Sequence, residues 1–374
     1  MKCSFVHIVI IIFSIVLQVL AQNKAEEFFK SGNAKYYLLD YKGAIQDYNK
    51  AIQINPKFAE VYYNRGTVKY ILLDYKGAIL DYNKTIELNP NRAEVYYNRG
   101  FAKNYLSDYR GAIEDYNKAV EINPNLAEVY NNRGTSKRNL SDYQQAIKDY
   151  NKAIELDPNN AQVYSNRGIA NHYLANYQGA IQDYNKAIEL DPNDAQVYNN
   201  RGLSKDKLSD YQGAIQDYTK AIALDPKFAE AYYSRGTDKR DLSDYRGAIQ
   251  DYNKAIELDP NDAKSYLNRG FSKLNLLDYT DAILDFNKAI KNNPNYDKAY
   301  FDRGIAKNIL LDYKGALQDY NKAIELNPNL PEVYYARGFV KLKLDDKNGA
   351  CLDWSKAGEL GYIKAYEQIK ENCK

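Results

Sequence analysis

The sequence contains few of the residue types that usually carry catalysis or metal binding. It has two histidines, three cysteines, one methionine and one tryptophan among 374 residues. His172 is the only histidine beyond residue 21, no catalytic triad accompanies it, and neither metal-ligand spacing nor a glycine-rich phosphate loop occurs. We therefore predict a protein that is not an enzyme and that holds no metal and no cofactor.

An excess of charge of one sign is also missing. The chain has 51 lysines and arginines against 49 aspartates and glutamates, a net charge of +2 that falls to +1 without Lys2. A nucleic-acid-binding surface would need clustered positive charge, so we expect no nucleic acid among the partners. With 45% hydrophobic and 27% charged residues, the composition is that of a folded chain.

The first 21 residues differ from the rest. Lys2 is their only formal charge, and an apolar run from Ile8 to Leu20 precedes small residues around Ala21. This pattern predicts a signal peptide over residues 1–21, and therefore an exported protein, periplasmic or secreted. The run is too short for the roughly 20 residues that span a bilayer, so we expect no membrane span after cleavage. An uncleaved anchor is the alternative.

The remainder of the chain repeats one unit of 34 residues, marked by a recurring Arg-Gly pair. We number the places of each repeat from its first residue. The ten repeats begin at Ala25, Ala59, Ala93, Ala127, Ala161, Ala195, Ala229, Ala263, Asp297 and Pro331. They cover residues 25–364, and residues 365–374 are expected to form a capping helix.

Each unit reads as two helices separated by breaks. Glycine always stands at the eighth place, leucine at the fourteenth and alanine at the twentieth, an aromatic residue always fills the twenty-fourth, and proline closes nine copies at the thirty-second. The spacing predicts helices over places 1 to 14 and 18 to 30, and thus an all-α fold. One such hairpin cannot bury its apolar face alone, so stacked copies must share a core.

These residues make the chain resemble the tetratricopeptide repeat family. Copy two, "AEVYYNRGTVKYILLDYKGAILDYNKTIELNPNR", has the family's residues in the family's order at Tyr62, Gly66, Tyr75, Ala78, Tyr82 and Pro90. The resemblance implies a right-handed superhelical α-solenoid whose first helices line a concave groove that binds other proteins or extended peptides. The seventh and eleventh places depart from the family, because they hold arginine and mostly lysine.

These cations stand on the helix face that also holds aromatic residues, glycine and leucine, at places 4, 7, 8, 11 and 14, which we expect to form the core. Lone buried cations would cost several kcal/mol each, so we expect partners. Aspartate at the twenty-third place of every copy is the candidate. The expected ion-pair ladder includes Arg65, Arg99, Arg133, Asp47, Asp81 and Asp115.

Two pairings are open for this ladder. Arg65 pairs either with Asp81 of its own copy or with Asp47 of the preceding copy. Copy one has Asp47 but Ser31 in place of an arginine, which favours pairing between one copy's aspartate and the next copy's arginine.

The opposite face of the first helix contains the candidate binding residues. The sixth place forms a row of asparagines: Asn64, Asn98, Asn132, Asn166, Asn200 and Asn268. Asparagine has both a donor and an acceptor, so such a row can hold the backbone of an extended peptide. Alternatively, the asparagines bond neighbouring helices. The fifth place adds Tyr63 and Tyr97 to the predicted groove.

The last three copies are more apolar on this face. The strip consists of Leu267, Phe271, Phe301, Ile305, Tyr335 and Phe339, with Leu274, Ile309 and Leu342 beside them. Contiguous exposed apolar surface usually marks an interaction site. The sequence leaves open whether a partner protein or a second copy, in a homodimer, covers it.

Two other functions remain possible for the groove. Its tyrosines can stack on sugars, which makes a lectin-like carbohydrate-binding groove an alternative to peptide binding, and a homo-oligomeric structural protein of the cell envelope is another. The carboxylate clamp of some tetratricopeptide cochaperones is incomplete. Asn33 and Asn64 match two of its members, but Phe29, Glu94 and Asn98 stand where its cations belong.

Two cysteines remain once the predicted signal peptide is removed, Cys351 and Cys373. Export makes a disulfide between them possible. Such a bridge would join the capping helix to the last hairpin.

Overall fold

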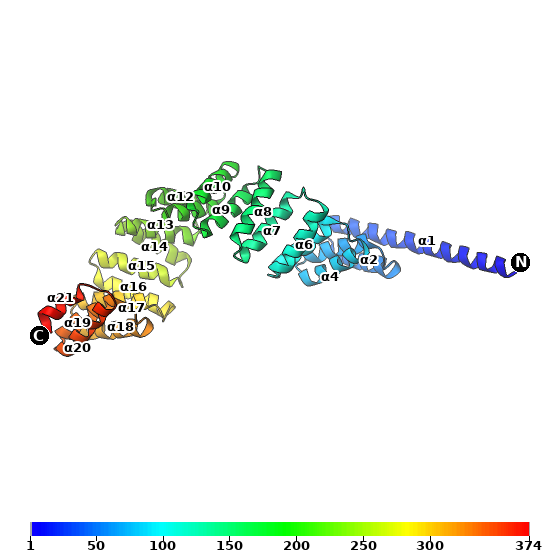
Figure 1. The fold of residues 1–374 in the computed structure, drawn as a ribbon. Coiled ribbons are helices and arrows are strands. Elements are labelled where there is room, and N and C mark those ends of the chain that lie inside the picture. Colours follow the sequence, from blue (N-terminus) through cyan, green and yellow to red (C-terminus); the bar gives the residue numbers. More distant parts are fainter. Residues whose placement is uncertain (1, 374) are drawn as a thin grey trace. The chain divides into compact units, whose positions relative to one another are not determined.

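The computed structural model describes residues 2–373, and every regular element in that range is an α-helix (Figure 1). The first helices of the repeats are α1 (Lys2–Tyr37), α3 (Ala59–Ile71), α5 (Ala93–Tyr105), α7 (Ala127–Asn139), α9 (Ala161–Tyr173), α11 (Ala195–Asp206), α13 (Ala229–Asp241), α15 (Ala263–Asn275), α17 (Asp297–Ile309) and α19 (Pro331–Lys343). The second helices are α2 (Tyr41–Ile54), α4 (Tyr75–Leu88), α6 (Tyr109–Ile122), α8 (Tyr143–Leu156), α10 (Tyr177–Leu190), α12 (Tyr211–Leu224), α14 (Tyr245–Leu258), α16 (Tyr279–Asn292), α18 (Tyr313–Leu326) and α20 (Lys347–Glu359), and α21 (Ala365–Asn372) follows.

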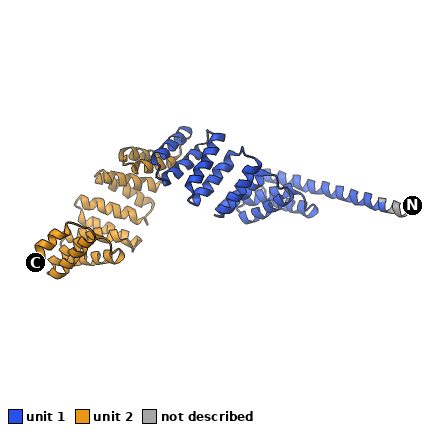
Figure 2. Ribbon diagram, in the orientation of Figure 1, with its two compact units in different colours: residues 1–191 blue, residues 192–374 orange. Residues whose placement is uncertain are grey.

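The chain divides into two compact units, Met1–Asp191 and Pro192–Lys374 (Figure 2). Within each unit the helix pairs stack in tandem, as expected for a solenoid. Successive first helices contact one another, for example α3 with α5 and α13 with α15, whereas successive second helices make no comparable contact among the described residues. The first helices therefore lie closer together and line the inner side of each stack.

The N-terminal helix α1 joins the apolar segment to the first repeat without a break. Among the described residues, Val9–Tyr37 is the one helix long and apolar enough to cross a membrane, a property that it shares with signal sequences. The side chains of residues 9–20 are exposed. The apolar run therefore contributes nothing to the core of the solenoid.

The core of each repeat lies where its second helix packs against its first. The ring of Tyr116 is wholly buried and faces Gly100, where an added Cβ atom would lie 2.8 Å from ring atom Cε1. Ala112 and Ala119, near Tyr116 on the same helix, are fully buried as well. Glycine at the eighth place is thus required by the tyrosine at the twenty-fourth.

The apolar stripe of the first helix differs from the expected one. In α5 it runs through the third, eighth and tenth places, at Val95, Gly100 and Ala102, all of which are buried. Leucine at the fourteenth place is 41% exposed at Leu106. The face predicted from places 4, 7, 8, 11 and 14 is only partly right. The eighth place is buried, as is the fourth at Tyr62, but the third and tenth places were missed, because the first helix also packs against the second helix of the preceding repeat.

A tight turn closes each hairpin. The residue at the fifteenth place has a left-handed backbone, with φ 61° at Leu39 and 62° at Ser141. The next residue caps the second helix; the side chain of Asp40 accepts a hydrogen bond of 2.9 Å from the backbone N–H of Gly43. The turn chemistry fixes how the two helices of a repeat face each other.

The repeated arginine pairs with the aspartate of its own repeat, so the expected pairing of Arg65 with Asp47 is wrong. Arg65 donates from Nε to Oδ2 of Asp81 over 2.9 Å and from Nη2 to Oδ1 over 2.5 Å, and Lys69 Nζ lies 2.7 Å from the same carboxylate. The side chains of Arg65 and Lys69 are 17% and 21% exposed. The aspartate is buried, while its cations reach partly into solvent, because the seventh and eleventh places flank the apolar stripe.

The link between repeats comes from another residue. Arg65 Nη1 donates to the side-chain oxygen of Asn49 in the preceding repeat. The same arrangement joins Arg99 to Asp115 and Asn83, and Arg133 to Asp149 and Asn117. In copy one, Asp47 accepts instead from Ser31 and pairs with Lys35.

The last hairpin is covered by α21. Its residues Ala365 and Ile369 pack with the buried Trp354 of α20. The sulfur atoms of Cys351 and Cys373 are bonded at 2.01 Å, with the two Cα atoms 5.7 Å apart. The bridge ties the end of the chain to α20.

Candidate functional site

The asparagine row on the inner helices bonds neighbouring repeats. Asn98 Nδ2 donates to the hydroxyl of Tyr63 over 2.9 Å, and Asn132 Nδ2 donates to that of Tyr97 over 3.0 Å. These bonds tie α5 to α3 and α7 to α5. At these two places the asparagines therefore bond neighbouring helices, which is the alternative to peptide binding. These bonds engage amide donors that a bound peptide would otherwise use.

The other asparagines of the row are also engaged. Asn64 donates to Asn33 over 2.8 Å, and Asn166 donates to Asn131 over 3.0 Å while accepting from Arg138. Asn200 accepts from Gln196, and Asn268 donates to the hydroxyl of Tyr233 and accepts from Arg240. The side-chain oxygens of Asn64, Asn98 and Asn132 accept no hydrogen bond from the described residues, so these three places offer acceptors rather than paired donors and acceptors.

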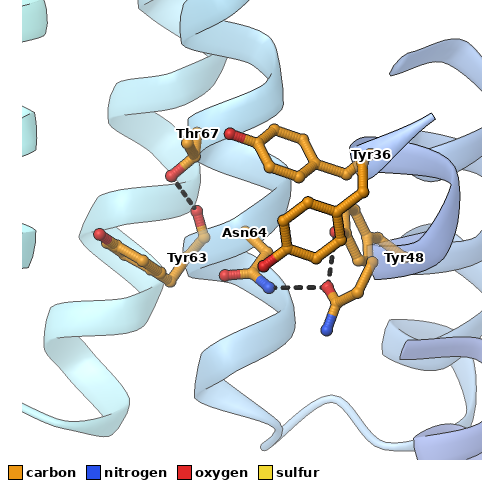
Figure 3. A pocket seen from close by; sticks show the side chains of 7 residues that line it. Tyr36, Tyr48, Tyr63, Asn64 and Thr67 are labelled. Carbon is orange, nitrogen blue, oxygen red and sulfur yellow. Dashed lines mark hydrogen bonds between the residues drawn. The ribbon is translucent and has the colours of Figure 1, made fainter. Parts of the chain in front are cut away.

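A tyrosine-lined hollow of 210 Å³ opens beside Asn64 (Figure 3). Its lining residues come from α1, α2 and α3: Asn33, Tyr36, Tyr37, Tyr48, Tyr63, Asn64 and Thr67. The oxygen of Asn33 accepts from both the hydroxyl of Tyr48 and the amide of Asn64, each over 2.8 Å. Its amide nitrogen donates to no described residue.

The aromatic walls of this hollow are tyrosine rings that lie close together. Tyr36 and Tyr37 have ring centroids 5.5 Å apart, and Tyr37 is 81% exposed. Burial, together with the neighbouring Tyr36 and Tyr37, raises the pKa of Tyr48 to about 12, so that its hydroxyl keeps its proton and donates to Asn33. Sequence reasoning named Asn33, Tyr63 and Asn64 but missed the other four lining residues. Tyr36, Tyr37 and Thr67 stand on first helices, where their places were the available signal, whereas Tyr48 comes from the second helix α2.

The apolar strip expected on the last repeats is mostly packed within the chain. Leu267 is only 2% exposed and belongs to the core between α15, α16 and α17. Phe301 and Ile305 pack on the next core cluster. The expectation of a continuous exposed strip is wrong, because side chains at the fifth and ninth places reach the neighbouring repeat.

The end of that strip is covered by the C-terminal cap. The ring centroid of Tyr335 lies 4.7 Å from that of Tyr362, and the ring centroid of Phe339 lies 5.3 Å from that of Trp354. Phe271 has the cations of Arg240 and Lys298 at 6.0 and 5.8 Å from its centroid. Phe271, Tyr335 and Phe339 are therefore half-buried.

Two buried carboxyl groups on the inner helices were not recognised from the sequence. Asp302, at the sixth place, is 4% exposed, and Asp238, at the tenth, is 1% exposed; one oxygen of each has no hydrogen-bond partner among the described residues. Burial raises the pKa of Asp302 to about 7, against a smaller opposing effect of Lys298. Burial, and then Asp206, raise the pKa of Asp238 to about 8. The signal in the sequence was an aspartate at the sixth or tenth place of a repeat, where most copies have asparagine or a small side chain.

Family comparisons agree with this architecture. Models described as tetratricopeptide repeat match residues 59–92, 93–126, 127–160, 149–182, 195–228 and 263–296, and a TPR repeat model matches residues 32–72, 175–209, 238–276 and 312–345. The chain therefore belongs to the tetratricopeptide repeat family. Such proteins are generally protein-interaction modules without enzymatic activity. A search of curated proteins finds no significant match.

Solved structures share the fold. The APC/C hetero-tetramer Cut9-Hcn1 is similar over 95% of this chain and 85% of that chain, with 17% identity and a TM-score of 0.51. A tetratricopeptide repeat protein from Parabacteroides merdae matches over 66% and 99%, with 22% identity and a TM-score of 0.50. MamA matches over 44% and 96%, with 30% identity and a TM-score of 0.42.

Proposed function

We propose that this protein is a non-enzymatic scaffold whose inner helix face binds an extended segment of a partner protein. The tyrosine-lined hollow of α1, α2 and α3 carries the proposal. It combines an aromatic wall, made by the half-buried Tyr36 and the exposed Tyr37, with amide hydrogens of Asn33 that no described residue accepts. A backbone carbonyl fits these donors, and an apolar side chain fits against the rings.

The polar groups beside the hollow extend the same pattern. The oxygens of Asn98 and Asn132 accept from no described residue, and the hydroxyl of Tyr63 still has a proton to give. These groups follow one another on α3, α5 and α7. An extended chain running across those helices meets the hydroxyl of Tyr63 on α3 and the amide oxygens of Asn98 on α5 and Asn132 on α7.

We propose further that the protein acts outside the cytoplasm, as an exported protein, periplasmic or secreted. The apolar N-terminal helix and the bonded pair Cys351 and Cys373 support this, because disulfides persist in oxidising compartments. Mass spectrometry of the protein recovered from the exporting cell tests cleavage after Ala21. A chain that keeps residues 1–21 would instead indicate an anchor.

Selection from a random peptide library tests the binding proposal. Selected peptides are titrated against the wild type, Asn33→Ala and Tyr36→Ala, with Leu352→Ala as the control because Leu352 is 72% exposed on the second helix α20. We expect a loss of about tenfold or more for the first two variants and none for the control, since each removes about 1 to 2 kcal/mol of contact. Binding that the first two variants leave intact and that soluble glycan abolishes would favour the carbohydrate-binding alternative.

A further inference from the structure

A second hollow, of 480 Å³, opens over Tyr233 in the C-terminal unit. We call it the acidic hollow; its lining residues are Leu203, Ala229, Glu230, Tyr233, Ser234, Ala255, Asp259, Asp262 and Lys264. Three of these residues carry a carboxylate and one carries an ammonium group. Charge complementarity therefore favours a cationic occupant.

The other aromatic residues at the fifth place show why a hollow exists here. Each of them is packed against a side chain that follows the second helix of its own repeat. Phe58 lies 5.0 Å from Phe29, and Tyr362 lies 4.7 Å from Tyr335, between ring centroids. Leu126 packs on the same core cluster as Tyr97, and Leu330 on that of Phe301. Tyr233 has instead the short side chain of Asp262 at the corresponding place, and the half-buried Tyr233 lines the hollow.

Repeat two shows what fits in this position. There the guanidinium of Arg92 lies 4.1 Å from the centroid of Tyr63, and Arg92 occupies the place that Asp262 has in repeat seven. The two tyrosines are held alike. Tyr63 and Tyr233 each have their ring centroid 6.1 Å from that of the tyrosine on the opposite helix, and each hydroxyl accepts from the asparagine of the next repeat, over 2.9 and 3.1 Å.

We propose that the acidic hollow binds an arginine side chain of the partner segment, whose guanidinium takes the position over Tyr233 that Arg92 takes over Tyr63. A planar guanidinium stacks on the ring and donates to carboxylates at its edges, which an ammonium group does less well. Glu230 and Asp259 supply these carboxylates. This inference rests on the proposed function, since it names one residue of the segment that the inner face binds.

The test uses the full chain, kept in mild detergent because of its apolar N-terminal helix. A blocked pentapeptide with one arginine between alanines is titrated by ligand-observed NMR, alongside analogues with citrulline or leucine. Citrulline has the shape of arginine without its charge. We expect the arginine peptide to bind about tenfold more tightly than either analogue, the effect of a desolvated cation on an aromatic ring.

Three variants localise the effect. Asp262→Arg places a guanidinium of the chain itself in the hollow and should abolish the preference for arginine. Glu230→Gln combined with Asp259→Asn removes two carboxylates without touching Asp262, which caps α15, and should reduce the preference at least fivefold. Asp225→Asn, at the place in repeat six that corresponds to Asp259, is the matched control and should change nothing.

Equal affinity of arginine and citrulline peptides, or a preference that survives in the double variant, would overturn the inference. The double variant keeps the cap of α15, so it still tests the inference if Asp262→Arg does not fold. In that case, the proposed function would still hold if the binding of library-selected peptides depended on Asn33 and Tyr36. Selected peptides indifferent to both hollows would instead refute the proposed function.

Discussion

Arg65 and Asp81 face each other across the two helices of one repeat and are joined by two hydrogen bonds, Nε to Oδ2 at 2.9 Å and Nη2 to Oδ1 at 2.5 Å. The carboxylate is buried, and Lys69 lies 2.7 Å from its second oxygen. This geometry recurs along the chain. It makes the cations part of the hairpin.

Removing one carboxylate of this ladder should destabilise the protein. Asp115→Ala leaves Arg99 and Lys103 without their partner, and we expect the free energy of unfolding in urea to fall by about 3 kcal/mol. Glu121→Gln breaks an exposed pair with Lys118 and serves as the control, with an expected loss below about 0.5 kcal/mol. Equal, small losses for both variants would show that the ladder is not a structural requirement.

Two tyrosine hydroxyls at the same place should respond in opposite directions. The hydroxyl of Tyr116 is buried and has no hydrogen-bond partner among the described residues, so Tyr116→Phe should raise the free energy of unfolding by about 1 kcal/mol. The hydroxyl of Tyr48 donates to Asn33 over 2.8 Å, so Tyr48→Phe should lower it by about 1 kcal/mol. Urea titrations of the two variants, compared with the wild type, measure both changes. A loss of stability in Tyr116→Phe would contradict the assignment.

The raised pKa of Asp302 predicts that stability falls as the pH rises from acidic to neutral. Its pKa is raised to about 7 in the folded chain from an ordinary value of 3.8, so the folded state holds the extra proton between these values. The stability it contributes is therefore greatest below pH 4 and is lost as the pH rises towards 7, by at most about 4 kcal/mol. Asp302→Asn should be less sensitive than the wild type when urea midpoints at pH 5 and pH 8 are compared. Parallel pH dependence of the two proteins would show that Asp302 is ionised in the folded chain.

The disulfide should stabilise the C-terminal cap. Cys351 and Cys373 are separated by 22 residues, and closing a loop of this length contributes about 3 kcal/mol. Trp354 is the only tryptophan of the chain and lies in the same cluster as Cys373, so its fluorescence reports on this end of the chain. We expect Cys373→Ser to shift the tryptophan transition to lower urea concentration. Asn372→Ser is the neighbouring control, and an equal shift in both variants would exclude the bridge as the cause.

The 34-residue period of the sequence predicted the helices well. The invariant glycine, alanine and aromatic places are local signals, and every repeat contains them. The partner of Arg65 was not predictable in this way. Asp47 and Asp81 stand at equivalent places, and only the geometry of the hairpin shows that the aspartate lies opposite the arginine of its own repeat while Asn49 makes the link between repeats.

The candidate site was predicted less completely for the same reason. Helical spacing placed Asn98 and Leu267 on the inner face, but it did not show that Asn98 bonds Tyr63 of the preceding repeat or that Leu267 is buried against the next one. The hollow over Tyr233 depends on Asp262, 29 residues away in the sequence, and on the absence there of a bulky side chain. Contacts between repeats decide these features, and no single repeat contains them.

Site-specific photocrosslinking tests the central claim most directly. A benzophenone amino acid replaces Tyr37, which is 81% exposed in the tyrosine-lined hollow, or Leu80, which is 67% exposed on the second helix α4, and each protein is irradiated with a library-selected peptide. The account predicts efficient crosslinking at residue 37, competed by unlabelled peptide, and none at residue 80. Crosslinking at residue 80 alone, or equally at both positions, would contradict binding on the inner helix face.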